Sequence, residues 1–264
     1  MRSFVKQFMF TELVSLSSQN SIKRCYKEAS VEMAINPTNP FHQWIIKLDG
    51  KSIKTQKRNI LAVPSPQLAT YIASEFNNQN QNMSLLSMQL FLLASHAVDL
   101  DFNASSREIM EMNFINNLQN DVILRRHQNK EKQLQIESQS FEPLLVQLNR
   151  KFNIEISSKD NINQEFFNQQ SKIKLESFIR EMNNWQLVSL NSKIEILESC
   201  FLGLNLQLGS IDIKKALALR NSLIEYDNLK KKSLEKQYYE NNLKLNLEAA
   251  QLFSQSITTQ SIMY

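Results

Sequence analysis

The chemistry open to this chain is limited first by its glycines, of which there are three in 264 residues. Gly50, Gly203 and Gly209 cannot form a phosphate-binding loop or a dinucleotide-binding fingerprint, because both need closely spaced glycines for the backbone to approach the phosphates. No Gly-x-Ser-x-Gly segment is present to position a nucleophilic serine. Neither phosphate chemistry nor serine hydrolase chemistry has a motif here.

Histidine and cysteine, the usual ligands of zinc and iron, are also sparse. His42, His96 and His127 are far apart, and no cysteine or carboxylate accompanies them at ligand spacing. Cys25 and Cys200 are too few for a disulfide framework, which fits a reducing compartment. We therefore expect no metal, no cofactor and no catalytic residue, and a binding role is a better hypothesis than an enzyme.

Two features are typical of binding surfaces, but each has a plainer explanation. Lys230-Lys231-Lys232 could contact an acidic partner, although a charge run is usually a solvated helix face. Trp44 and Trp185 could be interface hot spots, since aromatic side chains dominate interface energetics. Because Trp44 shares an alternating face with Ile46 and Leu48, the core interpretation is favoured for it.

Composition indicates a chain that is mostly helical and not inserted in a membrane. Hydrophobic residues make up 42%, while three glycines and five prolines leave little material for long loops. The 30 basic and 26 acidic residues are interspersed, so the net charge of +4 predicts neither nucleic acid nor anionic membrane as a partner. The best apolar run, residues 85–98, is interrupted by Gln89 and His96 before it reaches the ~18 residues of a membrane span.

A β-hairpin is predicted over residues 44–55. Trp44 to Leu48 alternates apolar and polar positions, and Asp49-Gly50 supplies the two positive-φ positions of a type I′ turn before the chain returns. A third short β-prone run follows over 59–63. We expect these runs to form a small antiparallel sheet.

A capped helix is predicted directly after the strands. Pro64-Ser65-Pro66 ends the third run, with Ser65 as N-cap and Pro66 at the first helical position. Leu68, Ile72 and Phe76 then lie on one face of this helix.

The rest of the chain has helical spacing. Residues 85–100 predict a buried helix, and the three-residue spacing of Ile109, Met112, Ile115 and Leu118 predicts another. Further helices are expected after Pro143, over 194–208 as one buried helix ending at Gly209, and after the N-cap Asp212. The fold class is therefore α+β, a small N-terminal antiparallel β-module with a helix followed by a larger all-α domain.

The boundary between these parts is expected near residues 80–84, which gives a β-rich module over 24–82 and a helical domain over 83–264. Residues 1–23 differ from both. They carry Arg2, Lys6 and Lys23 against the single acid Glu12, with serines and apolar residues at near-helical spacing. This start resembles a mitochondrial transit peptide, the alternative being an ordinary disordered terminus.

Motif residues in the first half of the chain carry a family resemblance. They are Trp44, Leu48, Asp49, Gly50, Lys54, Thr55, Val63, Pro64, Ser65, Leu68, Ala69, Ala73, Glu75 and Gln79, with Asp121, Arg126 and Phe141-Glu142-Pro143 further on. This pattern resembles the assembly factors that act as chaperones for the alpha subunit of the F₁ ATP synthase. Within residues 44–79 two positions depart from it, since Gln56 replaces a proline and Phe76 a tryptophan, and further on Phe141-Glu142-Pro143 stands where the family has Trp-Asp-Pro.

The resemblance also suggests where a partner would bind. The family has an acidic cluster before an aromatic residue, and Glu225-Tyr226 keeps its last acid and its aromatic, whereas Leu223 and Ile224 replace the other acids. The resemblance therefore implies a partner-binding role for Glu225 and Tyr226.

The resemblance implies a chaperone without turnover that holds the unassembled alpha subunit until the beta subunit replaces it. It would act in the mitochondrial matrix, as a monomer when free, with no cofactor and no nucleic-acid partner. The alternative is a structural accessory subunit of a mitochondrial membrane complex.

Overall fold

The computed structural model describes residues 22–34, 43–124, 131–157, 168–225 and 234–258. The chain divides into two compact units. The first unit groups the described residues up to Ala104 with those from Ala249 onward, and the second unit is Ser105–Glu248. A small antiparallel sheet near the N-terminus is followed by helices, which confirms the predicted α+β class.

The sheet of the first unit is antiparallel and centres on β3. Its strands are β2 (Ala29–Ala34), β3 (Gln43–Leu48), β4 (Lys51–Ser52) and β5 (Ala62–Val63). The order is β2-β3-β4, and β5 pairs with the other half of β3. A separate pair joins β1 (Ile22–Lys23) to β6 (Asn82–Met83).

The Asp49-Gly50 turn has the predicted geometry. Asp49 has φ +47° and Gly50 has φ +81°, the two positive values that a type I′ connection requires. Leu48 pairs with Lys51 across the turn. The hairpin prediction is therefore confirmed.

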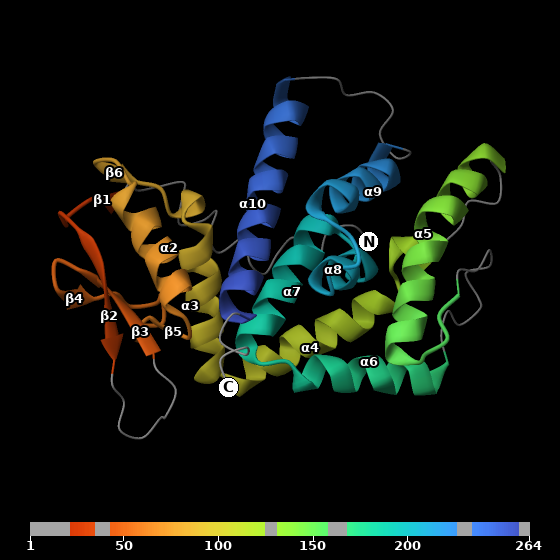
Figure 1. Cartoon of the computed structure of the whole chain (residues 1–264), viewed down its shortest axis with the longest axis horizontal. Coiled ribbons are helices and arrows are strands. Elements are labelled where there is room, and N and C mark those ends of the chain that lie inside the picture. Colours follow the sequence, from red (N-terminus) through yellow and green to blue (C-terminus); the bar gives the residue numbers. More distant parts are fainter. Residues whose placement is uncertain (1–21, 35–42, 125–130, 158–167, 226–233, 259–264) are drawn as a thin grey trace. The chain divides into compact units, whose positions relative to one another are not determined.

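Helix α2 (Pro66–Asn77) covers one face of this sheet. Ser65 accepts a hydrogen bond from the backbone N–H of Leu68 at 3.1 Å, as an N-cap should, and Pro66 begins the helix. Leu68, Ile72 and Phe76 are buried, as predicted. The helix packs on β2, β3 and β5 and on α3 (Gln89–Asp101), which lies beside it in Figure 1.

Helices form most of the second unit, where α8 is the central element. Seven consecutive residues of α8, from Cys200 to Leu206, are buried, and it packs against α5, α7 and α9. The helices that follow α3 are α4 (Ala104–Leu118), α5 (Glu131–Phe152), α6 (Gln169–Glu181), α7 (Asn184–Leu197), α8 (Cys200–Gln207), α9 (Ile213–Glu225) and α10 (Leu234–Thr258). Short 3₁₀ turns lie at η2 (Leu85–Ser87) and η3 (Val122–Leu124). No helix among the described residues has the length and apolar character to span a bilayer.

Several predicted helices have different bounds. The helix expected to start at Leu85 starts at Gln89, after the turn η2. The single helix expected over 194–208 is wrong, because Glu198 takes φ +55° and Ser199 caps a new helix. Gly209, at φ +72°, does follow the end of α8, and Asp212 does cap α9 by accepting from the Lys215 N–H at 2.7 Å.

Proline 143 and helix α4 also differ from expectation. Pro143 lies inside α5 and is exposed, rather than preceding a helix. In α4 the buried face consists of Met110, Phe114 and Leu118, whereas Ile109 and Met112 are 49% and 61% exposed. The three-residue spacing of Ile109 and Met112 therefore marks an outer surface, because the core uses the four-residue row instead.

We predict that Gly50→Val destabilises the protein by about 1 to 3 kcal/mol, because a β-branched residue is strained at positive φ. A Cβ at this position would meet no heavy atom within 4 Å, so the backbone alone accounts for the cost. Thermal unfolding measures the loss. The matched control is Gly50→Asn, which should lose less because asparagine visits this region. A midpoint unchanged by valine would contradict the turn geometry.

Candidate functional site

The motif residues of the first unit mainly hold backbone in place. The carboxylate of Asp49 accepts hydrogen bonds from the N–H groups of Lys27 and Glu28, at 3.0 to 3.1 Å, although it is exposed. The hydrogen bond from the Glu28 N–H has the largest effect on the pKa of Asp49, followed by that from the Lys27 N–H, and both lower it. Asp49 therefore joins the hairpin turn to the segment that leads into β2.

Thr55 ties the hairpin region to α3. Its buried hydroxyl donates to Oδ1 of Asp99 at 2.6 Å, and Nδ2 of Asn59 donates to the same oxygen at 2.7 Å. Asp99 is a buried carboxylate on α3 that the sequence analysis did not single out. Lys54, beside Thr55, is exposed and pairs in a β-bridge with Ile60.

Glu75 fixes the start of α3. Its two carboxylate oxygens each accept one backbone hydrogen bond at 2.8 Å, from the N–H groups of Leu90 and Phe91. These are N–H groups of the first turn, which have no partner within the helix. Burial raises the pKa of Glu75 to about 7, although the two N–H groups act in the opposite direction.

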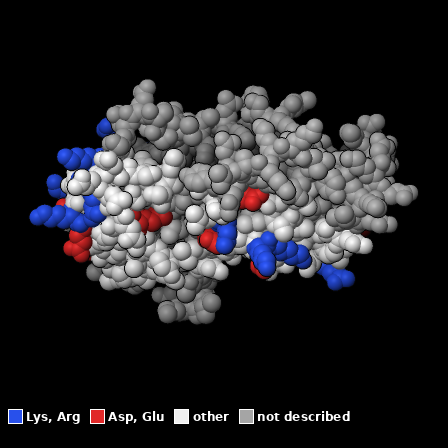
Figure 2. Space-filling view, turned by 90° about the horizontal axis from the view of Figure 1, so that it is seen from above, with Lys and Arg blue, Asp and Glu red and all other residues white. Residues whose placement is uncertain are grey.

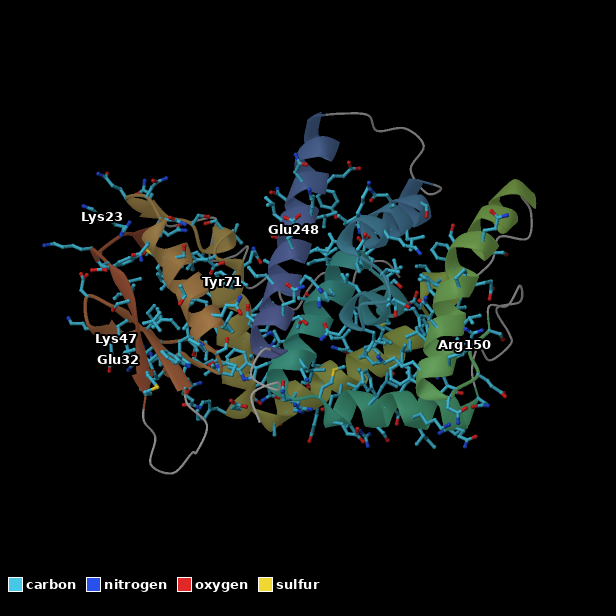
Figure 3. The ribbon with its side chains drawn as sticks, in the orientation of Figure 1. Lys23, Glu32, Lys47, Tyr71, Arg150 and Glu248 are labelled. Carbon is cyan, nitrogen blue, oxygen red and sulfur yellow. The ribbon has the colours of Figure 1, made fainter. Side chains whose placement is uncertain are left out.

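Aromatic packing surrounds the end of α2. The ring of Phe76 is edge-on to Tyr26 at 6.0 Å and to Phe91 at 5.1 Å between centroids. The Tyr26 hydroxyl donates to the backbone oxygen of Phe76 at 2.7 Å. Phe76 thus has a packing role. Tyr71 is half-buried on the same helix, and on the sheet Lys47 pairs with Glu32 (Figure 3).

Asp121 is the corresponding carboxylate of the second unit. It is buried and accepts from the N–H groups of Ile123 and Phe201 and from the Ser199 hydroxyl, at 2.9 to 3.1 Å. Burial raises the pKa of Asp121 to about 6. It holds η3 against the start of α8, which explains why the chain breaks at Ser199.

The remaining predicted residues are not brought together. Pro143 is on the outer face of α5, while Arg126 and Tyr226 lie outside the described residues. Glu225 is the last residue of α9, and its side chain is likewise outside the described part. Trp44 lies on β3, half-buried, and pairs with Met33 across the sheet.

A buried lysine in α7 was not predicted from the sequence. Lys193 is 0% exposed, and its ammonium donates to Oε1 of Gln207 on α8 at 2.6 Å. Burial lowers its pKa to about 7. Neighbouring Glu195, whose pKa burial raises to about 7, accepts from Asn191 at 2.9 Å. The Lys193–Gln207 bond ties α7 to α8, whereas the Asn191–Glu195 bond lies within α7.

Metal chemistry finds no support in the described residues, where no three potential His, Cys, Asp or Glu ligands gather. The polar groups described above bond to backbone or to each other, which is a structural arrangement. What remains available to a partner is the outer surface. It includes Ile109 and Met112 on α4 and the cations of the hairpin.

We predict that Glu75 makes stability depend on pH. Its folded pKa, about 7, lies above the ordinary 4.5, so the folded state binds the proton more tightly than the unfolded state. Relative to Glu75→Gln, the natural protein should lose about 2 to 3 kcal/mol as pH rises from about 5 to about 8, with little further loss above that. Urea unfolding of both proteins at stepped pH measures the difference. A constant difference would mean that Glu75 titrates normally when folded.

Comparison with known proteins relates the chain to one family. Residues 23–149 match a family described as ATP12 chaperone protein. A curated relative, the mitochondrial protein atp12 of Schizosaccharomyces pombe, is 24% identical over 262 residues, which cover 95% of this chain and 88% of the relative. The match includes Trp44, Glu75, Asp121 and Pro143, the motif positions named above.

Solved structures agree in fold. Atp12 from Paracoccus denitrificans superposes with a TM-score of 0.76 at 16% identity, covering 89% of this chain and 98% of that one. The Atu1473 protein of Agrobacterium tumefaciens gives 0.76 at 17% identity, covering 94% and 95%. With the family match over residues 23–149 and the curated relative, these findings support the ATP12 chaperone proteins as the family of this chain.

Proposed function

We propose that this protein is an assembly chaperone of the F₁ ATP synthase that binds the unassembled alpha subunit. The observation that carries the proposal is the match of residues 23–149 to the ATP12 chaperone family. Assembly of ATP synthase is the role of this type of chaperone. The choice of the alpha subunit rests on the resemblance of the motif residues.

Such a chaperone works by covering surface rather than by catalysis. An alpha subunit without its beta neighbour exposes the apolar surface that normally lies between them, and an exposed patch of that kind promotes aggregation. The chaperone would cover this patch until beta replaces it. Replacement requires an interface that can dissociate, in which polar contacts supply specificity more than strength.

Exposed apolar side chains on α4 suit this role. Ile109 and Met112 lie one turn apart and are about half exposed or more, while the opposite row of the same helix is buried. Methionine adapts to irregular partner surfaces because its side chain is unbranched and flexible. We infer that this row contributes to the apolar part of the client contact.

Glu225 is our candidate for a polar contact. It is the C-terminal residue of α9, where the helix dipole disfavours a negative charge. A carboxylate at this place contributes little to helix stability. Removal of this carboxylate should therefore weaken client binding with little effect on folding. Tyr226 would supply an adjacent aromatic contact.

Location in the mitochondrial matrix is the last part of the proposal. The S. pombe relative is named as mitochondrial, and residues 1–23 have the composition of a transit peptide. The client would meet the chaperone after import.

We predict that Glu225→Lys weakens capture of the alpha subunit while stability changes by less than about 0.5 kcal/mol. Co-expression with alpha, followed by sedimentation and pull-down, measures soluble complex. Glu181→Lys is the matched control, because Glu181 is the exposed last residue of α6 and should leave capture unchanged.

Two results of this experiment would contradict different parts of the proposal. If the natural protein keeps no alpha subunit in solution, the chaperone assignment to alpha is wrong. If Glu225→Lys captures as well as the natural protein, only the role of Glu225 is wrong. Co-purification with the mature complex in stoichiometric amount would instead favour a structural subunit.

We also predict that deletion of residues 1–23 abolishes import into isolated mitochondria. The thermal midpoint of the purified truncated protein should fall only slightly, because among the described elements the deletion removes only β1 (Ile22–Lys23) and its two-residue pairing with β6. A control fusion of residues 1–23 to a passenger protein should be imported. Normal uptake of the truncated chain would contradict the transit-peptide assignment.

A further inference from the structure

The cations of the hairpin region are not balanced by acids. Lys51, Lys54, Lys57 and Arg58 fall within eight residues, and no Asp or Glu occurs from residue 50 to residue 74. Apart from residues 1–23 and the run Lys230-Lys231-Lys232, the two signs are interspersed elsewhere in the chain. We refer to these four residues as the basic turn. Figure 2 shows Lys and Arg side chains gathering over the strand-bearing part of the chain.

The four side chains of the basic turn are free to bind. All four are exposed, and none forms an ion pair or a side-chain hydrogen bond with the described residues. Other cations of the first unit are occupied. Arg24 donates to the backbone oxygens of Tyr26, Lys27, Asn77 and Gln79. An unpaired surface charge is normal by itself, but four within eight residues, from Lys51 on β4 to Arg58, produce a local positive field.

The backbone beneath these cations is fixed. Within the turn, the Thr55 N–H donates to the Asn59 oxygen at 2.8 Å and the Arg58 N–H to the Thr55 oxygen at 3.0 Å. Asp99 then holds Thr55 and Asn59 from below, through the two bonds described above. The cations therefore stand on a preorganised turn, which lowers the entropic cost of binding.

Arg58 occupies a position that suits glycine better. Its φ is +68°, in the left-handed region that few non-glycine residues adopt. The cost of such a conformation is accepted where surrounding bonds determine it, and such positions concentrate at functional sites. Here the left-handed residue is an arginine, and its exposed guanidinium can bind a carboxylate through two parallel hydrogen bonds.

The geometry points to the basic turn as a docking site for an acidic segment of the polypeptide client, an inference that rests on the proposed function. Charge complementarity selects the partner, since carboxylates spaced along an extended chain could meet Lys54, Lys57 and Arg58 in succession. A single apolar side chain, Ile60, is exposed beside them at 51%. A chaperone acts on protein, and the fixed turn favours a shaped ligand over a diffuse lipid surface.

The test reverses charge at two positions and compares capture of the alpha subunit. Lys54→Glu/Lys57→Glu should reduce capture of the alpha subunit roughly tenfold or more at low ionic strength. The difference in capture between this variant and the natural protein should become smaller when salt is raised, because salt screens exposed charges. Lys54→Arg/Lys57→Arg keeps the charge and should capture normally. The matched control is Lys214→Glu/Lys215→Glu, which reverses two exposed charges on α9 and should change capture little.

The outcomes separate this inference from the proposed function. If the natural protein fails to hold alpha in solution, the proposed function is rejected and this inference with it. If the natural protein and Lys54→Glu/Lys57→Glu hold alpha equally well, only the basic turn is rejected. Cosedimentation with vesicles of phosphatidylglycerol and phosphatidylcholine adds a further arm. Vesicle binding that is lost on reversal, with client capture unchanged, would overturn the inference and assign the turn to a membrane.

Discussion

The placement of α3 depends on the carboxylate of Glu75. Most residues of α3 are buried, and the half-buried Glu75 accepts hydrogen bonds from two N–H groups of its first turn, which have no partner within the helix. An unmade bond of this kind would cost about 1 to 3 kcal/mol for each buried donor. The helix in turn carries Asp99, which binds Thr55 and Asn59. One buried contact therefore supports the helix, and the helix supports the hairpin turn.

Features that depend on neighbouring residues alone could be predicted from the sequence. The Asp49-Gly50 turn needs only two residues that tolerate positive φ, and the Ser65-Pro66 start needs only a cap and a fixed φ. The break between α7 and α8 has a different origin. It depends on Asp121, which lies far away in the sequence and binds Ser199 and the N–H of Phe201. The pattern of apolar residues predicts an unbroken helix there, because it contains no information about the distant partner Asp121.

The roles of the candidate site residues were harder to predict from the sequence for the same reason. Resemblance marks Glu75 and Asp121 as motif positions, but only the structure assigns them to the starts of α3 and α8. Asp99 did leave a signal, since a single acid in the apolar stretch before residue 100, four residues after Ser95, lies on a buried row. Lys193 left a weaker signal, because a lysine in the mixed segment Asn191-Ser192-Lys193-Ile194-Glu195 is usually a solvated position.

The internal use of carboxylates determines the outer charge of the first unit. Its described residues contain eight Lys and Arg but six Asp and Glu. Glu75 and Asp99 bond to groups inside the fold, Asp49 binds backbone N–H groups, and Glu32 pairs with Lys47. Among the described residues, none of these carboxylates forms an ion pair with a cation of the basic turn. Because Asp99 lies beneath the turn and fixes its backbone, the four cations stay exposed on a turn whose own acid is directed into the fold.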